Sequence, residues 1–258
     1  MILGVLVGIV LGLTGAGGGI LAVPALIAGM GWSMQQASPV ALLAVACGAI
    51  AAVMDAWEKK LIYLKEAILI GIAAIPFSAL GVRLAHILPQ QILKGIFALV
   101  LLFVGLRSLN KHFSVMWKKR PLSTQKPINT TISDDENAPS LNTSAAIGAI
   151  AGLLSGMLGV GGGFIIVPML NKFSTLPAQK IVATSLMVIA LISISSVINA
   201  MLYGITLPLK ETSAFVLAVV IGALIGRKLI VFCNEKMIQM IFSLLLISVA
   251  TSMMISLT

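Results

Sequence analysis

Long apolar runs alternate with short polar connections along almost the whole chain. Six of the eight runs are about 20 residues long, which is the length that a helix needs to cross a bilayer, and the first and fifth runs are longer. The runs are 1–30, 37–57, 66–86, 92–109, 143–171, 180–203, 211–231 and 237–257. This pattern predicts an all-α polytopic membrane protein whose connections lie at the two faces of the membrane.

One connection is much longer than the others. Residues 110–142 combine charged residues with proline, serine, threonine and asparagine. This composition is typical of a solvated linker, because it offers too little apolar area for a core of its own. A regulatory role for the segment is the alternative. We therefore expect a first membrane repeat at 1–109, a polar cytoplasmic linker at 110–142 and a second membrane repeat at 143–258.

The two sides of the linker repeat one another. When the sequence is shifted so that Gly4 falls on Gly148, a whole series of glycines coincides. The first series is Gly4, Gly8, Gly12, Gly15, Gly17, Gly18 and Gly19, and the second is Gly148, Gly152, Gly156, Gly159, Gly161, Gly162 and Gly163. Such a coincidence indicates a duplication, with four apolar segments in each half.

The first glycines of each series recur every fourth residue. Gly4, Gly8 and Gly12 therefore share one helix face, which predicts close packing against another helix. On such a face we expect the helix pair to relax around one added methyl group, as in Gly8→Ala.

The consecutive glycines at 17–19 and 161–163 need another explanation, because a packing face requires a small residue only at every fourth position. Each glycine destabilises a helix by about 1 kcal/mol relative to alanine and also permits positive φ. A break within the membrane is tolerated where the freed backbone groups are buried in protein or line a cavity. We therefore expect the first segment of each half to be broken at its glycine motif.

The positions of lysine and arginine favour one of two topologies. If all eight runs crossed the membrane, 10 of the 17 basic residues would share a face. If the first run of each half is a re-entrant hairpin, 14 share the face of the linker, and only Arg83, Lys94 and Lys210 oppose them. Short cytoplasmic loops are enriched in lysine and arginine, which favours the hairpins. Each half then crosses three times, so the halves are inverted repeats, a recurrent design of transporters.

The composition excludes several other classes of protein. Hydrophobic residues make up 59% of the chain and charged residues 10%, whereas about 25% are charged in a soluble domain. The net charge of +9 comes from residues between apolar runs, so we assign it to membrane orientation and not to nucleic-acid binding. Cys47 and Cys233 behave as small apolar residues. The sequence contains no H-E-x-x-H or G-x-S-x-G motif, and we expect neither an enzyme nor a bound cofactor or metal.

An anion inside the membrane requires hydrogen-bond donors. The first N–H groups of a helix have no intrahelical acceptor and lie at its positive dipole end. If half-helices begin near Gly19 and Gly163, two such ends would bind an anion without a buried cation. For the hydroxyl side chains, a hydrogen bond to their own helix is the alternative. The candidate substrate-binding residues are Thr14, Gly15, Gly17, Gly18, Gly19, Ser155, Gly159, Gly161, Gly162, Gly163, Thr184, Ser185 and Asn199.

Two charged side chains are further candidates. Asp55 is a candidate for proton coupling, but Lys59 follows one helical turn later, so an interfacial ion pair is the favoured interpretation. Arg83 is a candidate attractor of anions, or a side chain that extends to the membrane surface.

The paired motifs Gly12-x-x-Gly15-x-Gly17-Gly18-Gly19 and Gly156-x-x-Gly159-x-Gly161-Gly162-Gly163 resemble the TauE/SafE sulfite exporter family. The run Val182-Ala183-Thr184-Ser185-Leu186 is similar to the second half of that family. The resemblance covers the chain outside 110–142. It implies a carrier in a bacterial inner membrane for small sulfur-containing anions such as sulfite, thiosulfate or sulfoacetate. Because Val40-Ala41 stands where the second half has Thr184-Ser185, we expect any hydroxyl contact there from one half only.

A secondary carrier for a small anion is therefore the leading hypothesis, with the lipid bilayer and the anion as its partners and a proton as a candidate coupling ion. A passive anion channel with the same glycine-lined site is the alternative, and a membrane scaffold without transport is a third.

Overall fold

A computed structural model describes residues 2–117, 139–174, 176–205, 207–229 and 235–255, and these contain helices and no strand. The prediction of an all-helical chain is therefore confirmed over this part. The helices are α1 (Ile2–Thr14), the 3₁₀ helix η1 (Gly15–Leu21), α2 (Ala22–Met30), α3 (Met34–Glu58), α4 (Leu64–Ile87), α5 (Gln90–Trp117), α6 (Leu141–Leu158), α7 (Gly163–Phe173), α8 (Ala178–Leu202), α9 (Leu209–Leu229) and α10 (Glu235–Ile255).

Six of the described helices are long and apolar enough to cross a membrane, namely α3, α4, α5, α6, α8 and α9. In the hairpin topology expected from the sequence, α10 crosses the membrane and α6 is one arm of a hairpin. Helix α6 is 18 residues long and meets the length criterion, whereas the apolar part of α10, Met240–Ile255, is shorter. Length alone therefore does not distinguish the arm of a hairpin from a crossing. The two differ in whether the chain turns back to the end of the molecule from which it started.

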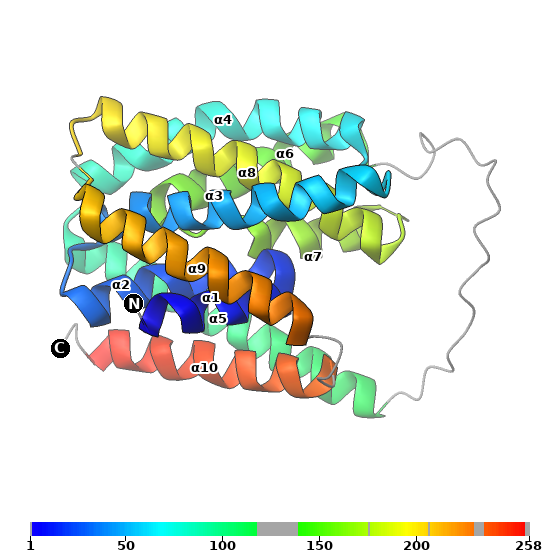
Figure 1. Cartoon of the computed structure of the whole chain (residues 1–258). Coiled ribbons are helices and arrows are strands. Elements are labelled where there is room, and N and C mark those ends of the chain that lie inside the picture. The colour runs from blue at the N-terminus through cyan, green and yellow to red at the C-terminus, as the bar shows by residue number, and fades with distance from the viewer. Residues whose placement is uncertain (1, 118–138, 175, 206, 230–234, 256–258) are drawn as a thin grey trace.

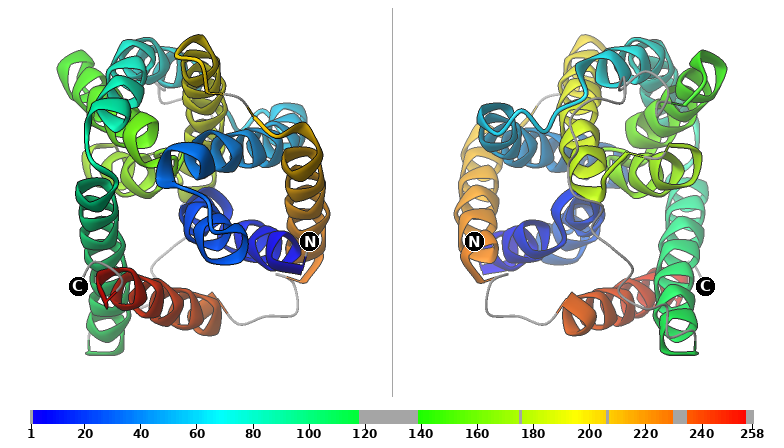
Figure 2. Two further views of the ribbon diagram at one scale, coloured as in Figure 1. Left: turned by 90° about the vertical axis from the view of Figure 1, so that its left-hand side faces the viewer. Right: turned by 90° about the vertical axis from the view of Figure 1, so that its right-hand side faces the viewer.

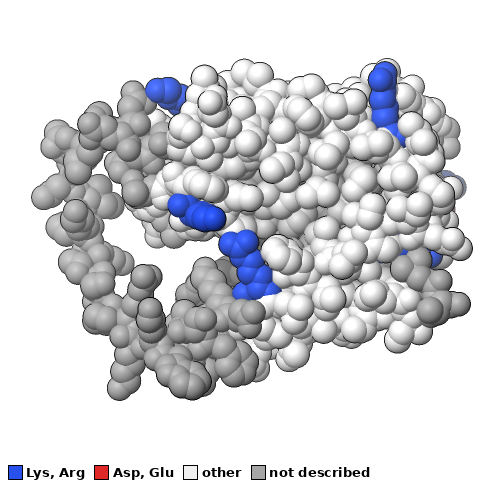
Figure 3. All heavy atoms as spheres, turned by 180° about the vertical axis from the view of Figure 1, so that it is seen from behind, with Lys and Arg blue, Asp and Glu red and all other residues white. Residues whose placement is uncertain are grey.

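The outer surface of the molecule is apolar over a broad middle zone. Ile72 and Phe103 are each 65% exposed, which is typical of side chains that face lipid. In Figure 3 the lysine and arginine side chains on the visible face lie toward its two ends, with an uncharged band between them. This arrangement fits a bilayer around the middle of the helices.

The chain reverses direction at both glycine motifs. Figure 1 shows α1 beginning and α10 ending at one end of the molecule, here called the terminal end. Helix α5 ends and α6 begins at the opposite end, the linker end. Helix α2 returns to the terminal end, and a side chain on Gly29 would overlap Leu3 near the start of α1. Helix α7 returns in the same way from the end of α6 to the linker end.

The directions of the helices also place the basic residues. Lys59, Lys60, Lys65, Lys172, Lys180 and Lys228 lie where helices meet the linker end, and Arg107 lies in the half of α5 nearer to it. Arg83, Lys94 and Lys210 lie at the terminal end.

The two halves exchange helices. Helix α1 packs against α9, and α6 packs against α4 in the same manner. Helices α3 and α8 pack on each other, and so do α5 and α10, which lie at the periphery in Figure 2. The first segment of each half therefore contacts the third segment of the other half.

Glycines bring the exchanged helices into backbone contact, as their four-residue spacing predicts. A β-carbon on Gly8 would lie 2.9 Å from the backbone nitrogen of Ala223 in α9. A β-carbon on Gly152 would lie 2.9 Å from Cα of Ala74 in α4. The expectation that Gly8→Ala would be tolerated is wrong on this geometry, because backbone atoms cannot rotate away as a side chain can.

Candidate functional site

The two glycine breaks meet between α3 and α8. A β-carbon on Gly19 would lie 3.3 Å from the carbonyl oxygen of Val160 in the second break. A β-carbon on Gly161 would lie 2.9 Å from Cγ1 of Val45 in α3 and 3.2 Å from Cγ2 of Ile189 in α8. The fold thus brings together two motifs that are far apart in the sequence.

The second break has the conformation that its glycines permit. Gly159, Gly161 and Gly162 have φ values of 77°, 78° and 74°, in the left-handed region that strains other residues. Gly159 ends α6, and Gly162 caps α7. The prediction of a half-helix beginning at Gly163 is confirmed.

The first break is built differently. The 3₁₀ helix η1 follows α1 directly, and its capping residue Thr14 has right-handed helical angles. Gly18 and Gly19 do not have positive φ, so the first break does not use the left-handed conformation that glycine permits. A β-carbon on Gly18 would lie 2.7 Å from the backbone nitrogen of Leu11, so this glycine serves close packing within the turn. The structure therefore provides a free helix N-terminus at α7 and a continuous helical turn in the first half.

The N-terminus of α7 is buried. Gly161, Gly162 and Gly163 are all buried, and the first helical bonds run from the N–H groups of Ile165 and Ile166 to the carbonyl of Gly162. The N–H groups of Gly163 and Phe164 precede these bonds, so they have no intrahelical acceptor. Together with the positive dipole end, they form an environment that favours an anion.

Three buried hydroxyl groups near this break have no hydrogen-bond partner within the part of the chain that the structure describes. They belong to Ser155, Ser193 and Ser196, each 0% exposed. The hydroxyl of Ser193 lies 3.4 Å from the position that a β-carbon on Gly161 would take. Ser155 accepts the N–H of Gly159 at its carbonyl, so it lies one turn before the break. A buried hydroxyl without a partner costs about 1–3 kcal/mol, so these groups point to a ligand or water that occupies the site.

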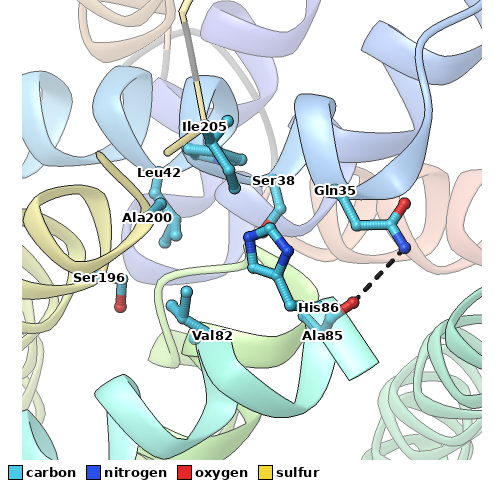
Figure 4. Close-up of a pocket in the computed structure, with 11 residues that line it drawn as sticks. Gln35, Ser38, Leu42, Val82, Ala85, His86, Ser196, Ala200 and Ile205 are labelled. Carbon is cyan, nitrogen blue, oxygen red and sulfur yellow. Dashed lines mark hydrogen bonds between the residues drawn. The ribbon is translucent and has the colours of Figure 1, made fainter. Parts of the chain in front are cut away.

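A small pocket leads from the terminal end toward the break. Its cavity volume is about 20 Å³, which is room for about one water molecule, and its lining includes Ser38, His86, Gly156 and Ser196. Figure 4 shows the His86 ring next to Ser38. A side chain at Gly159 would overlap Ser38, so the pocket reaches the edge of the second break.

Arg83 and Tyr203 lie beside the His86 side of this pocket. The guanidinium of Arg83 donates a hydrogen bond to the hydroxyl of Tyr203, and its Cζ lies 5.6 Å from the centre of the ring. The His86 and Tyr203 rings are 5.9 Å apart. All three side chains are exposed, so a positive charge stands near the mouth of the pocket.

Four of the expected polar ligands already have hydrogen bonds elsewhere. Thr14 and Ser185 donate to Val10 and Val182 of their own helices at 2.7 and 2.8 Å, and Asn199 donates to the carbonyl of Ser195 at 2.8 Å. Thr184 accepts the N–H of Tyr63 at 3.0 Å. Thr14 and Ser185 would have to give up these bonds to donate to an anion, whereas Thr184 only accepts in its bond and keeps its own hydroxyl proton.

Asp55 forms the expected ion pair with Lys59. The distance between Oδ1 and Nζ is 3.0 Å, and the side chains are 53% and 60% exposed. An exposed pair of this kind contributes about 0–1 kcal/mol to stability.

The candidate set lacked Ser193 and Ser196. Their spacing of three residues places them on one face of α8, and this spacing is the feature of the sequence that could have indicated a shared polar face. Ser38 and His86 carried no comparable signal, because the fold alone brings α3 and α4 together at this pocket.

Comparison with known proteins gives a consistent result. The model of the family described as "Sulfite exporter TauE/SafE" matches residues 1–253. The chain is 27% identical over 250 residues to "Probable membrane transporter protein YunE" of Bacillus subtilis (strain 168), covering 92% of this chain and 88% of that protein. It is 30% identical over 205 residues to "Probable membrane transporter protein MJ0441" of Methanocaldococcus jannaschii, covering 77% of this chain and 70% of that protein. No solved structure matches the chain.

Proposed function

The chain belongs to the sulfite exporter TauE/SafE family, and from this premise we propose that it is a secondary carrier for a small sulfur oxyanion or organic sulfonate. That it is a multi-pass transporter of a bacterial membrane follows from the family, from the names of its relatives and from its six apolar helices. The substrate and the carrier mechanism are the proposal.

The three buried hydroxyl groups without partners carry this proposal. Ser193 lies beside Gly161, Ser155 lies one turn before the second break and Ser196 lines the pocket with Gly156, while the first N–H groups of α7 have no acceptor within their helix. A sulfonate or sulfite group presents three oxygens that accept hydrogen bonds, so it matches a site made of neutral donors. The positive end of α7 supplies the favourable electrostatic term without a buried lysine or arginine.

The two ends of the site differ, which favours a carrier over a channel. The pocket is lined by residues near the terminal end of α3, α4, α6 and α8. At the linker end, hydrogen bonds from Tyr63 to Thr184 and from Ser144 to Glu66 join α4 to α8 and α6. Access from one side at a time is the property that separates a carrier from an open pore.

The inverted-repeat topology is part of the same proposal. It is supported by the exchange of α1 and α6 between the halves, since a pseudo-twofold axis would interchange the pairs α1–α9 and α6–α4. The excess of basic residues at the linker end supports a cytoplasmic linker.

This topology predicts that the linker and the C-terminus lie on opposite sides of the membrane. Green fluorescent protein fused to the C-terminus should be dark, and alkaline phosphatase fused there should be active. Fusions within residues 110–142 should give the reverse. A fluorescent C-terminal fusion would exclude the inverted arrangement.

The transport assay uses the purified protein in liposomes with sulfite, thiosulfate, sulfoacetate and taurine as test substrates. A carrier exchanges labelled anion faster when unlabelled anion is present on the opposite side, whereas a channel does not. Stimulated exchange of at least one of these anions is expected. Failure of all four to move would contradict the proposed substrate class.

Ser193→Ala tests the hydroxyl groups directly. Loss of one hydrogen bond to a charged ligand should weaken apparent affinity by about tenfold. Stability should stay the same or rise, because the substitution removes a buried hydroxyl that has no partner. Ser185→Ala is the matched control on the same helix, since its hydroxyl already bonds to Val182. Equal effects of the two substitutions on exchange would remove Ser193 from the site.

A further inference from the structure

We propose that Glu66 is the proton-binding group whose ionisation is coupled to anion movement. The inference rests on the proposed carrier function and adds a coupling site that is separate from the anion site. It assigns to Glu66 the role for which the sequence suggested Asp55.

Glu66 is a buried acid at the contact between the two halves. It is 2% exposed and lies in the first turn of α4 at the linker end. The hydroxyl of Ser144, itself 0% exposed, donates to Oε2 of Glu66 at 2.6 Å. Ser144 lies in the first turn of α6, so this hydrogen bond joins a helix of the first half to a helix of the second.

The charged groups on the neighbouring elements are few. Helix α4 packs chiefly on α6, which contains no titratable residue, and on α8, whose single titratable residue is Lys180 in its first turn. On α4 itself, Lys65 is adjacent, while Arg83 and His86 lie at the terminal end. Glu66 is thus the one acidic group that these three helices hold, and an ionisable residue buried in a transporter is a functional candidate.

Ser144 can satisfy Glu66 in either protonation state. A hydroxyl donates its proton to a carboxylate and accepts a proton from a neutral carboxyl group. When a proton from water binds to a carboxylate oxygen of Glu66, the hydrogen bond can therefore reverse without leaving a buried polar group unpaired. Asp55 differs because it is exposed and pairs with Lys59.

The same helix connects Glu66 to the anion site. Ser144 at the start of α6 is about 16 Å from Ser155 near its end, at about 1.5 Å per residue. Between them, Gly148 and Gly152 hold α6 against the backbone of Ile70 and Ala74 in α4. A change in the Glu66–Ser144 contact therefore acts on the helix that ends at the second glycine break.

The test compares Glu66→Gln with Asp55→Asn in liposomes, using thiosulfate because its own charge does not change near neutral pH. Glutamine keeps an oxygen that can accept the Ser144 hydroxyl but cannot carry a proton. Glu66→Gln should retain exchange and should lower accumulation driven by a pH gradient about tenfold or more, since the proton site is lost. Asp55→Asn should retain both activities.

A second measurement does not depend on transport. Infrared spectra of the purified full chain, recorded as a function of pH, should contain the carbonyl band of a protonated carboxyl group that Glu66→Gln lacks. If Glu66→Gln accumulates thiosulfate as the wild type does, the coupling role is wrong while the carrier function stands. If the wild-type protein moves no test anion, the carrier function fails. The infrared titration then decides whether Glu66 binds a proton, and identical spectra would overturn the inference.

Discussion

Gly161→Ala should lower anion exchange by about 10- to 100-fold, the effect expected when one or two hydrogen bonds to a charged ligand are lost. Gly161 has φ 78°, and its added methyl group would lie 2.9 Å from Val45 and 3.4 Å from the hydroxyl of Ser193. The methyl group would therefore occupy the space between the glycine turn and a hydroxyl that has no other partner. Exchange of sulfite, thiosulfate or sulfoacetate in liposomes measures this effect.

Gly204→Ala is the matched control for backbone strain. Gly204 has φ 81°, and nothing lies within 4 Å of the position of its β-carbon. Both substitutions force an L-residue into the left-handed region, at about 1–2 kcal/mol each. Similar thermal stability with a selective loss of exchange in Gly161→Ala would support the site, and a similar loss in both variants would assign the effect to strain.

Gly152→Ala should produce a clear loss of stability. Its methyl group would lie 2.9 Å from Cα of Ala74, so α6 and α4 must separate. Overpacking of this kind costs about 1–3 kcal/mol. The melting temperature of the purified protein in detergent should fall by several degrees, and Gly8→Ala should act similarly through α9.

Gly48→Ala is the control for this substitution. Gly48 lies in α3, and its added methyl group would meet only Cδ2 of Leu11, the end of a flexible side chain. The variant should be neutral or more stable, because alanine favours a helix by about 1 kcal/mol relative to glycine. If Gly152→Ala melts no lower than Gly48→Ala, the backbone contact between α4 and α6 does not limit stability.

The helices and the packing glycines could be predicted because both depend on local periodicity. An apolar run of about 20 residues predicts a span whatever its neighbours are. Likewise, a glycine at every fourth position of α1 or α6 marks a face before its partner is known. The ion pair of Asp55 and Lys59 was also predictable, since residues four apart on a helix are neighbours.

The details of the site depend on contacts between distant segments, and these the sequence did not determine. Identical glycine triplets form a 3₁₀ turn in one half and a left-handed turn in the other: Gly18 packs on Leu11, whereas Gly162, its equivalent in the second half, packs on Ala151. The missing partners of Ser193 and Ser196 became evident only once α3, α6 and α8 had been placed around them. The burial of Glu66 depends in the same way on α6, which begins 75 residues later at Leu141.

The exchange of helices between the halves has a consequence for biosynthesis. Helix α4 enters the membrane before its glycine-lined partner α6 has been translated. Helix α1 likewise enters before α9, the helix on which it packs, has been translated. Neither repeat can therefore complete its packing while it is alone at the ribosome, and the nascent first half must persist in the bilayer with its small-residue faces uncovered. The two halves expressed as separate polypeptides should accordingly assemble only when they are produced together.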